Sequence, residues 1–293
     1  MPDHVLTQQA ELGGPSVPSV ATPVTVIEAK RGLFQLNLRE LWEYRELLYF
    51  LVWRDVKVRY KQTAIGAGWA IFQPLMTMII FTVVFGHFAQ IPSEGVPYPV
   101  FAFAALLPWG YFSQSLQRSS SGLVSNAHLI TKVYFPRFII PLASVVTPAV
   151  DLIPALVVFF GLMAWFGATP TWGVLALPLF LLLAMMTALA VGLWLAPLNV
   201  RYRDVGHTIP FLIQFWMFAS PIVYPLSLVP EEWRSLYSLN PLVGVIHGFR
   251  WALLGIDDPD MGAMLISGSM ILCLFLGGVI FFRRMERTFA DVI

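Results

Sequence analysis

Long apolar runs separated by short polar segments fill most of the chain after residue 64. A helix needs roughly 20 apolar residues to cross a bilayer core of about 30 Å, and six runs reach that length. They lie at about residues 65–91, 97–118, 137–166, 173–199, 205–225 and 261–283. The pattern predicts an all-α membrane protein with six transmembrane helices.

The central run, residues 138–166, contains a single charged residue, Asp151, together with Pro141, Pro148 and Pro154. Each proline removes a backbone N–H and strains the preceding turn, which a packed neighbour must compensate. An ionised carboxylate at this depth is costly. We therefore expect this span to be packed within the protein, with Asp151 facing inward. Asp151 either makes a structural hydrogen bond to a neighbouring span, which we favour, or takes a direct part in gating or lining a path.

Residues 1–34 are polar, contain Pro, Ser and Thr, and have no apolar core. Such a segment does not bury enough apolar surface to offset the entropy of ordering. It is predicted to be a flexible cytoplasmic tail, followed by one membrane domain over residues 35–293.

The segment just before the first span, residues 37–61, has apolar residues at helical spacing. Asn37 with Glu40 resembles a capping box at its start. The pattern predicts an amphipathic helix in the membrane surface, with Trp42 and Tyr49 at the level of the headgroups. An ordinary amphipathic helix packed on another domain is the alternative.

Two short helices are expected between the fifth and sixth runs. The first starts at Pro230, and the second has Asn240 at the N-cap and Pro241 at the first helical position. The second ends near Gly255 after about 14 residues, which is roughly 21 Å and too short to cross. We predict an amphipathic, re-entrant helical hairpin at the outer edge of the membrane, which either gates the exit or only packs the spans.

The composition agrees with an integral membrane protein, because 57% of the residues are apolar and 12% are charged. A single cysteine excludes a disulfide framework. With the N-terminus inside and six spans, 16 of the 18 Lys and Arg residues fall on the inner side. Only Arg234 and Arg250 fall outside, so the positive-inside rule predicts that both termini are cytoplasmic. The chain has no strongly acidic or basic tail, so nucleic acid is not expected as a partner.

No motif for chemistry is apparent. The sequence has no phosphate-binding loop and no Gly-Lys pair, so any ATP must be hydrolysed by another chain. The five histidines are far apart in sequence and do not have the spacing of metal ligands. There is no nucleophile elbow. We expect no catalytic centre, metal site or cofactor on this chain.

Several separated motifs resemble the ABC-2 type permease family, and most closely its members that export O-antigen, capsule or teichoic-acid polysaccharides. The resemblance covers about residues 35–287. The motifs are Arg54-Asp-Val-Lys-Val-Arg-Tyr-Lys-Gln-Thr63 with Gly66 and Trp69, Lys132-Val-Tyr-Phe-Pro-Arg137, Asn199-Val-Arg-Tyr-Arg-Asp-Val205, Ser220-Pro221, and Asn240-Pro241 with Phe249-Arg250.

This resemblance implies a homodimeric permease in the bacterial cytoplasmic membrane. It also implies two copies of a separate ATP-binding subunit, which holds ATP and Mg²⁺. The substrate would be a lipid-linked polysaccharide that moves outward, and membrane lipids would surround the complex.

The loop between the second and third spans is able to form a short helix from Asn126 to Thr131. In the related permeases this loop supplies a coupling helix that contacts the ATPase, as does the N-terminal surface helix. A passive solvated loop is the alternative. The expected coupling residues are Asn126, His128, Leu129, Lys132, Arg54 and Arg59. Arg201, Arg203 and Asp204, in the loop between the fourth and fifth spans, are expected to form a surface ion-pair cluster.

Aromatic residues make up 14% of the chain. Sugar C–H groups stack on aromatic rings, although interfacial belts explain most aromatic residues of a membrane protein. The candidates for the glycan path or its gate are Phe81, Phe85, Trp216, Phe218, Tyr224 and Trp251.

Two other functions remain open on the sequence. One is an ABC-2 type exporter of drugs or small amphiphiles. The other, from a different class, is a secondary transporter or a membrane-embedded enzyme.

Overall fold

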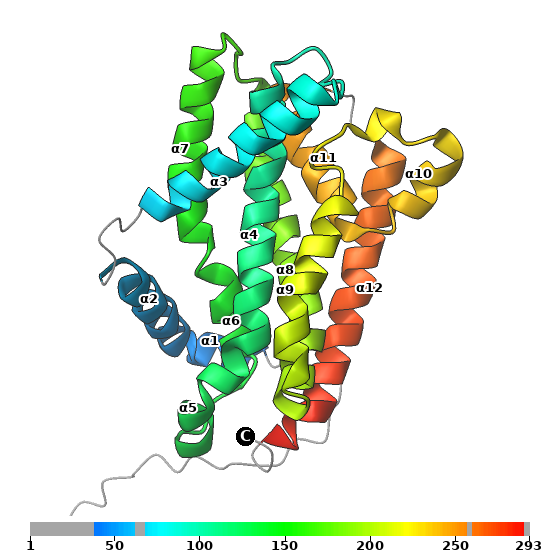
Figure 1. Ribbon diagram of the computed structural model, residues 1–293. Coiled ribbons are helices and arrows are strands. Elements are labelled where there is room, and N and C mark those ends of the chain that lie inside the picture. The colour runs from blue at the N-terminus through cyan, green and yellow to red at the C-terminus, as the bar shows by residue number, and fades with distance from the viewer. Residues whose placement is uncertain (1–37, 62–67, 257–259, 290–293) are drawn as a thin grey trace, which may run out of the picture. The chain divides into compact units, whose positions relative to one another are not determined.

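A computed structural model describes residues 38–61, 68–256 and 260–289 (Figure 1). Every regular element in these residues is a helix, which confirms the predicted all-α class. The predicted tail and Asn37 of the predicted capping box lie outside the described residues.

Four helical segments of the described chain are long and apolar enough to cross a membrane. They are Ile71–Phe88, Ile139–Trp165, Trp172–Arg201 and Met261–Glu286, and they correspond to the first, third, fourth and sixth predicted spans. The second predicted span lies in α4 (Tyr98–Ser125), which is long enough at 28 residues but less apolar. The fifth lies in α9 (Asp204–Phe218), which has only 15 residues. The count of six spans therefore stays a prediction.

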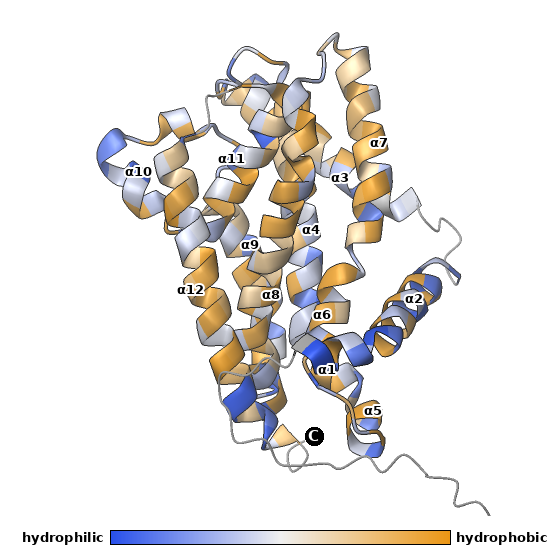
Figure 2. Cartoon of the chain, turned by 180° about the vertical axis from the view of Figure 1, so that it is seen from behind, coloured by the Kyte–Doolittle hydropathy of each residue, from blue (hydrophilic) through white to orange (hydrophobic). Residues whose placement is uncertain are grey.

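The helices α4 and α8 (Leu177–Arg201) form the centre of the fold. Most residues of α4 are buried. On the other side of α8 lies α12 (Met261–Glu286), and the two helices approach closely because Gly278 has no side chain. A Cβ atom there would lie 3.0 Å from the carbonyl oxygen of Ala190. Small residues allow such close helix packing inside membranes. Figure 2 shows hydrophobic residues along most of the length of α8 and α12.

The first predicted span consists of α3 (Gly68–Phe81), which is continued by a π-helix, η1 (Thr82–Phe88). It contacts α4 and lies across it in Figure 1. Only 11% of the residues in its apolar stretch Ile71–Phe88 are buried. Its outer face therefore exposes large apolar side chains, among them Trp69, Ile80 and Phe88.

The central run contains two helices, α6 (Ile139–Val146) and α7 (Ala149–Trp165). The break falls at Thr147 and Pro148, where proline has no N–H to donate. The hydroxyl of Thr147 donates a hydrogen bond of 2.8 Å to the carbonyl of Ala143. Asp151 consequently lies in the first turn of a new helix, α7.

The predicted surface helix is divided at Tyr44 into α1 (Leu38–Glu43) and α2 (Arg45–Lys61). One side of α2 packs on α6, with Leu51 fully buried. The outer side exposes several aromatic residues, namely Trp42 of α1 and Tyr49, Phe50 and Trp53 of α2. Tryptophan and tyrosine are the residues that favour the membrane–water interface, and the interfacial position of this helix stays a prediction.

The two short helices form where the sequence predicts them. They are α10 (Glu231–Tyr237) and α11 (Pro241–Leu254), with Asn240 capping α11 and Gly255 ending it at a positive φ of 64°. The predicted amphipathic character is wrong for α11, because every one of its residues except Trp251 is buried. It packs against α4, α8 and α12. The re-entrant path of the pair stays a prediction.

The remaining elements are short: α5 (Ala127–Lys132) and the 3-10 turns η2 (Trp172–Ala176) and η3 (Leu226–Leu228). The ion-pair cluster predicted for residues 201–204 is not found among the ion pairs of the described chain. The guanidinium of Arg201 instead lies over the ring of Tyr202, 5.4 Å from its centroid. Neighbouring residues at a helix end point in different directions, which sequence proximity does not reveal.

Candidate functional site

The predicted short helix after the second span is present as α5, directly after the end of α4. Asn126 makes the turn between them, since its side-chain amide donates to the carbonyl of Gly122 at 2.9 Å. Ile130 is buried and Leu129 is half-buried, whereas His128 and Lys132 are exposed. The helix is therefore held on one side and offers polar side chains on the other.

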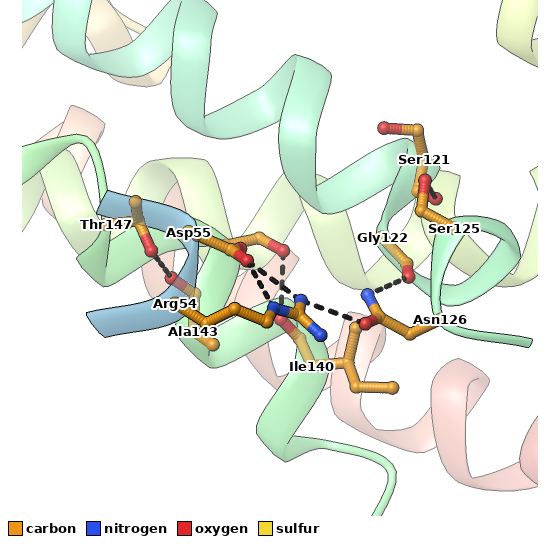
Figure 3. Close-up of polar contacts among 10 residues, drawn as sticks. Arg54, Asp55, Ser121, Gly122, Ser125, Asn126, Ile140, Ala143 and Thr147 are labelled. Carbon is orange, nitrogen blue, oxygen red and sulfur yellow. Dashed lines mark hydrogen bonds and ion pairs between the residues drawn. The ribbon is translucent and has the colours of Figure 1, made fainter. Parts of the chain in front are cut away.

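Arg54 of α2 connects the surface helix to the start of α5 (Figure 3). Its Nη2 atom donates to the side-chain oxygen of Asn126 at 3.0 Å. The same guanidinium binds the carboxylate of Asp55 at 2.8 and 2.9 Å. A guanidinium has a rigid fork of donors, so it binds two acceptors in a defined geometry. The base of α5 is thus linked to a residue 72 positions earlier in the chain.

A second polar cluster lies further along α2, where Arg59 and Tyr60 both contact Asp151 of α7. Arg59 forms an ion pair with the carboxylate, and Tyr60 donates its hydroxyl proton to it. Arg59 also donates to the side-chain oxygen of Gln114 on α4 at 2.8 Å. Burial, followed by the hydrogen bond to Asp151, raises the pKa of Tyr60 to about 12. The hydroxyl of Tyr60 is therefore protonated at neutral pH and able to donate.

These contacts correct one sequence expectation: Asp151 was expected to bond to a neighbouring span, but its partners, Arg59 and Tyr60, come from the surface helix. The role of Arg59 in coupling stays a prediction. A buried carboxylate requires a paired cation, and helical periodicity does not show which distant cation supplies it.

The two clusters are five residues apart on α2, or about 7.5 Å along the helix axis. Together they connect α5, through Arg54 and then Arg59, to the first turn of α7 just after the break at Pro148. Such an arrangement joins the start of α5 to the membrane helices through side-chain contacts.

The six aromatic candidates for the path occupy different surroundings. Phe81 is buried and packs edge-on against Phe85 at 5.4 Å. Trp216 donates its ring N–H to Asn240 at 2.9 Å. Of the six, only Phe218 is largely exposed. Their role in the path stays a prediction.

The last two candidates, Tyr224 and Trp251, both have aromatic partners. Tyr224 contacts α10, and Trp251 belongs to α11. The hydroxyl of Tyr224 shares a hydrogen bond of 2.7 Å with that of Tyr237. Trp251 packs edge-on against Phe180 with ring centroids 6.2 Å apart. Each of the two side chains is therefore held by another aromatic residue.

Sequence reasoning assigned no role to Arg250, a buried cation on α11. Its guanidinium donates to the carbonyls of Pro221 and Ile222 at 2.8 and 2.7 Å. It also lies 3.6 Å from the ring centroid of Phe101. A single arginine in an otherwise apolar helix is costly unless its donors are satisfied, and this was the signal available in the sequence.

The helix α9 ends at Phe218, before Pro221 and before the predicted residue 225, and Arg250 and Asn240 bind the carbonyls that follow its end. The side-chain amide of Asn240 donates to the carbonyl of Ala219 at 2.9 Å. Arg250 then binds the carbonyls of the following turn. The carbonyls of the turn that follows α9 thereby accept hydrogen bonds inside the protein, as buried backbone groups must.

Among the described residues, no three His, Cys, Asp or Glu side chains lie together in a way that could hold a metal ion. The candidate site is a set of connections between helices and contains no arrangement of nucleophile and base. In the described part of the chain, four apolar helices long enough to cross a membrane, joined to a surface helix by the ion pair of Arg59 with Asp151, indicate a multi-pass membrane protein.

The sequence model of the ABC-2 type transporter family matches residues 46–254. The chain belongs to this family, as its motifs indicated. It is 32% identical over 259 residues to an "O-antigen export system permease protein RfbA" of Myxococcus xanthus. These aligned residues make up 87% of this chain and 98% of the relative. A protein of the same name from Klebsiella pneumoniae is 28% identical over 85% of this chain and 95% of its own. The "Polysialic acid transport protein KpsM" of Escherichia coli is 24% identical over 80% of this chain and 91% of its own length.

Proposed function

We propose that this chain is the permease subunit of an ATP-driven exporter that moves a lipid-linked polysaccharide across the bacterial cytoplasmic membrane. The observation that carries the proposal is the match to a permease named for O-antigen export over almost its full length. The similarity to the "Inner membrane transport permease YadH" of Escherichia coli is 34% but covers only 30% of this chain. The relatives that match over most of their length are named for O-antigen or polysialic acid, so polysaccharide export has more support than export of small amphiphiles.

Removal of the chain from its cell tests this function. We expect the surface polysaccharide to be lost and the lipid-linked glycan to accumulate on the inner side of the membrane. Re-expression of the chain should restore the surface glycan. An unchanged surface glycan after removal would contradict the proposal.

The energy comes, in this proposal, from a separate subunit that binds ATP and Mg²⁺, since the sequence of this chain has no phosphate-binding loop. We further propose that two copies of each subunit assemble. An exposed face of α9 supports a second copy, because it carries Phe211, Phe215 and Phe218 with the polar Gln214 among them. A glutamine in a membrane helix is better satisfied by another helix than by lipid. The mass of the detergent-solubilised complex measures the number of copies.

The helix α5 is the proposed contact with the ATP-binding subunit, and Asn126 and Arg54 hold its base. Insertion of Gly-Gly between Asn126 and Ala127 should leave the protein inserted while lowering export per ATP hydrolysed by about tenfold or more. The reason is that a flexible joint absorbs the displacement of α5. Export and phosphate release are measured together in proteoliposomes.

A matched insertion after Gly167 is the control, because this residue lies in an exposed turn with open space around it. It should reduce export little. Normal export per ATP with the insertion at Asn126 would remove the support for α5 as the coupling helix.

Both termini are cytoplasmic in this proposal, as the distribution of Lys and Arg predicts. The structure supports a common side for α5 and the C-terminal end of α12, which lie at the same end of the helices in Figures 1 and 2. Single cysteines in a Cys273→Ser background test the orientation. A cysteine at Ser93 or Thr169 should react with an impermeant reagent added to intact cells, and one at Ser125 should not. The reverse pattern would overturn the topology.

A further inference from the structure

The segment that follows α5, Phe135-Pro136-Arg137, contacts the far end of the chain. The guanidinium of Arg137 donates to the backbone carbonyl of Glu286, the last residue of α12. The backbone N–H of Arg137 lies 3.4 Å from the side-chain oxygen of the same glutamate. The guanidinium also lies over the ring of Phe289, 5.8 Å from its centroid. A cation at this position is favourable because the carbonyl end of a helix carries partial negative charge.

Buried aromatic rings continue this contact into the protein. Phe138 packs edge-on against Phe282 with ring centroids 6.1 Å apart, and Phe282 packs against Phe289 at 5.6 Å. All three side chains are buried, and so is Phe135. Edge-to-face pairs fix the relative orientation of the rings as well as burying them. We call the residues Phe135, Arg137, Phe138, Phe282, Glu286 and Phe289 the C-terminal clasp.

The clasp gives α5 a second anchor. The first end of α5 is joined to α2 through Asn126 and Arg54. Beyond its other end, only residues 133–136 separate Lys132 from Arg137, and Val133 is in an extended conformation. Four extended residues reach at most about 14 Å. A displacement of α5 that would stretch this connection beyond its maximum length therefore moves Arg137 as well.

We propose that the C-terminal clasp is a second route by which displacement of α5 reaches the membrane helices, and that Arg137 is its positioning residue. The first route runs through α2 to α7, and the second runs through the clasp to α12. This inference rests on the proposed function, in which a partner subunit moves α5. The competing view is that the clasp only packs the end of α12, in which case its loss lowers stability and leaves coupling unchanged.

The substitution Arg137→Gln separates these two views, since it removes the charge while leaving the buried rings in place. Export per ATP hydrolysed should fall by about fivefold or more, at an unchanged amount of assembled complex. Arg137→Lys should recover part of the loss, because an ammonium keeps the charge but lacks the planar fork that stacks on a ring. Arg203→Gln is the matched control, since Arg203 is an exposed arginine in the turn before α9 and should leave the ratio unchanged.

A reporter on α12 measures transmission directly. Arg284 is exposed near the end of α12, so an environment-sensitive fluorophore on Arg284→Cys, in a Cys273→Ser background, reports on that end. Its signal should change when a non-hydrolysable ATP analogue binds the complex. In the Arg137→Gln background the change should be lost, while a fluorophore on Thr131→Cys of α5 should still respond.

Each outcome either supports or overturns the second route through the clasp. An unchanged ratio of export to hydrolysis, or a normal response at Arg284→Cys, overturns the second route even if the melting temperature falls. Should Arg137→Gln fail to assemble, Phe289→Leu keeps apolar burial and removes the ring beneath the guanidinium, and the same two readouts apply. If the wild-type complex shows no ATP-dependent export, the proposed function fails, which is a result distinct from failure of the clasp.

Discussion

Replacing Asp151 with leucine is expected to lower the free energy of unfolding by about 3–5 kcal/mol. The substitution leaves the Arg59 guanidinium without its carboxylate and removes the acceptor of the Tyr60 hydroxyl. Arg59 is only 29% exposed, so water replaces the lost partner incompletely. Asp151→Asn should be milder, at about 1–3 kcal/mol, because an amide oxygen still accepts from Tyr60. Reversible unfolding of the detergent-solubilised protein measures both.

The double variant Asp151→Leu with Arg59→Met tests whether the ion pair is the cause. Removing both charges leaves no uncompensated ion, so the double variant should be more stable than Asp151→Leu alone. The interaction energy of the cycle should fall in the range of about 0.5–3 kcal/mol typical of contacting residues. Strictly additive effects would show that the two residues do not interact in the folded protein.

Replacing Arg250 with methionine should be comparably destabilising, because each buried carbonyl left without a donor costs about 1–3 kcal/mol. The guanidinium binds the carbonyls of Pro221, Ile222 and Tyr224, of which the first two are bound within a buried region. Methionine fills much of the space but donates no hydrogen bond, so these backbone groups lose a partner without regaining water. The loss should appear as a lower melting temperature and a lower yield from the membrane.

Arg250→Lys locates the effect. An ammonium donates to fewer of the carbonyls and does not stack flat on Phe101, so the protein should fold with a loosened turn after α9. Exchange of the amide hydrogens of residues 219, 220 and 222–224 should be faster, and exchange in α4 should be unchanged. Arg284→Met, on an exposed site of α12, serves as the control. A methionine variant as stable as the wild type would show that Arg250 does not hold this turn.

Local signals in the sequence predicted several elements correctly. The start of α11 follows from Asn240 and Pro241, because a side-chain acceptor satisfies the first N–H groups and proline needs none. Its end follows from Gly255, which adopts a left-handed conformation at low cost. The short helix expected from Asn126 to Thr131 is present as α5, one residue later at each end. These features depend on residues within a few positions of each other.

The contacts that hold the turn after α9 and the partner of Asp151 were not predictable in the same way. Each depends on a side chain far away in the chain: Arg250 for the carbonyls after α9, and Arg59 for Asp151. Such contacts exist only after the helices have packed, and one sequence does not show which distant side chains meet.

By itself, the sequence determined the helical class, the membrane environment and the positions of the short capped helices, because hydropathy and helix ends are local properties. Only the tertiary structure decided which apolar helices face protein and which do not. The short α11 is buried except at Trp251, whereas few residues of α3 are buried. Both are apolar, and lipid is as apolar as a protein core, so composition does not distinguish them. The ion pair of Arg59 with Asp151 and the clasp around Arg137 likewise appear only when distant segments come together.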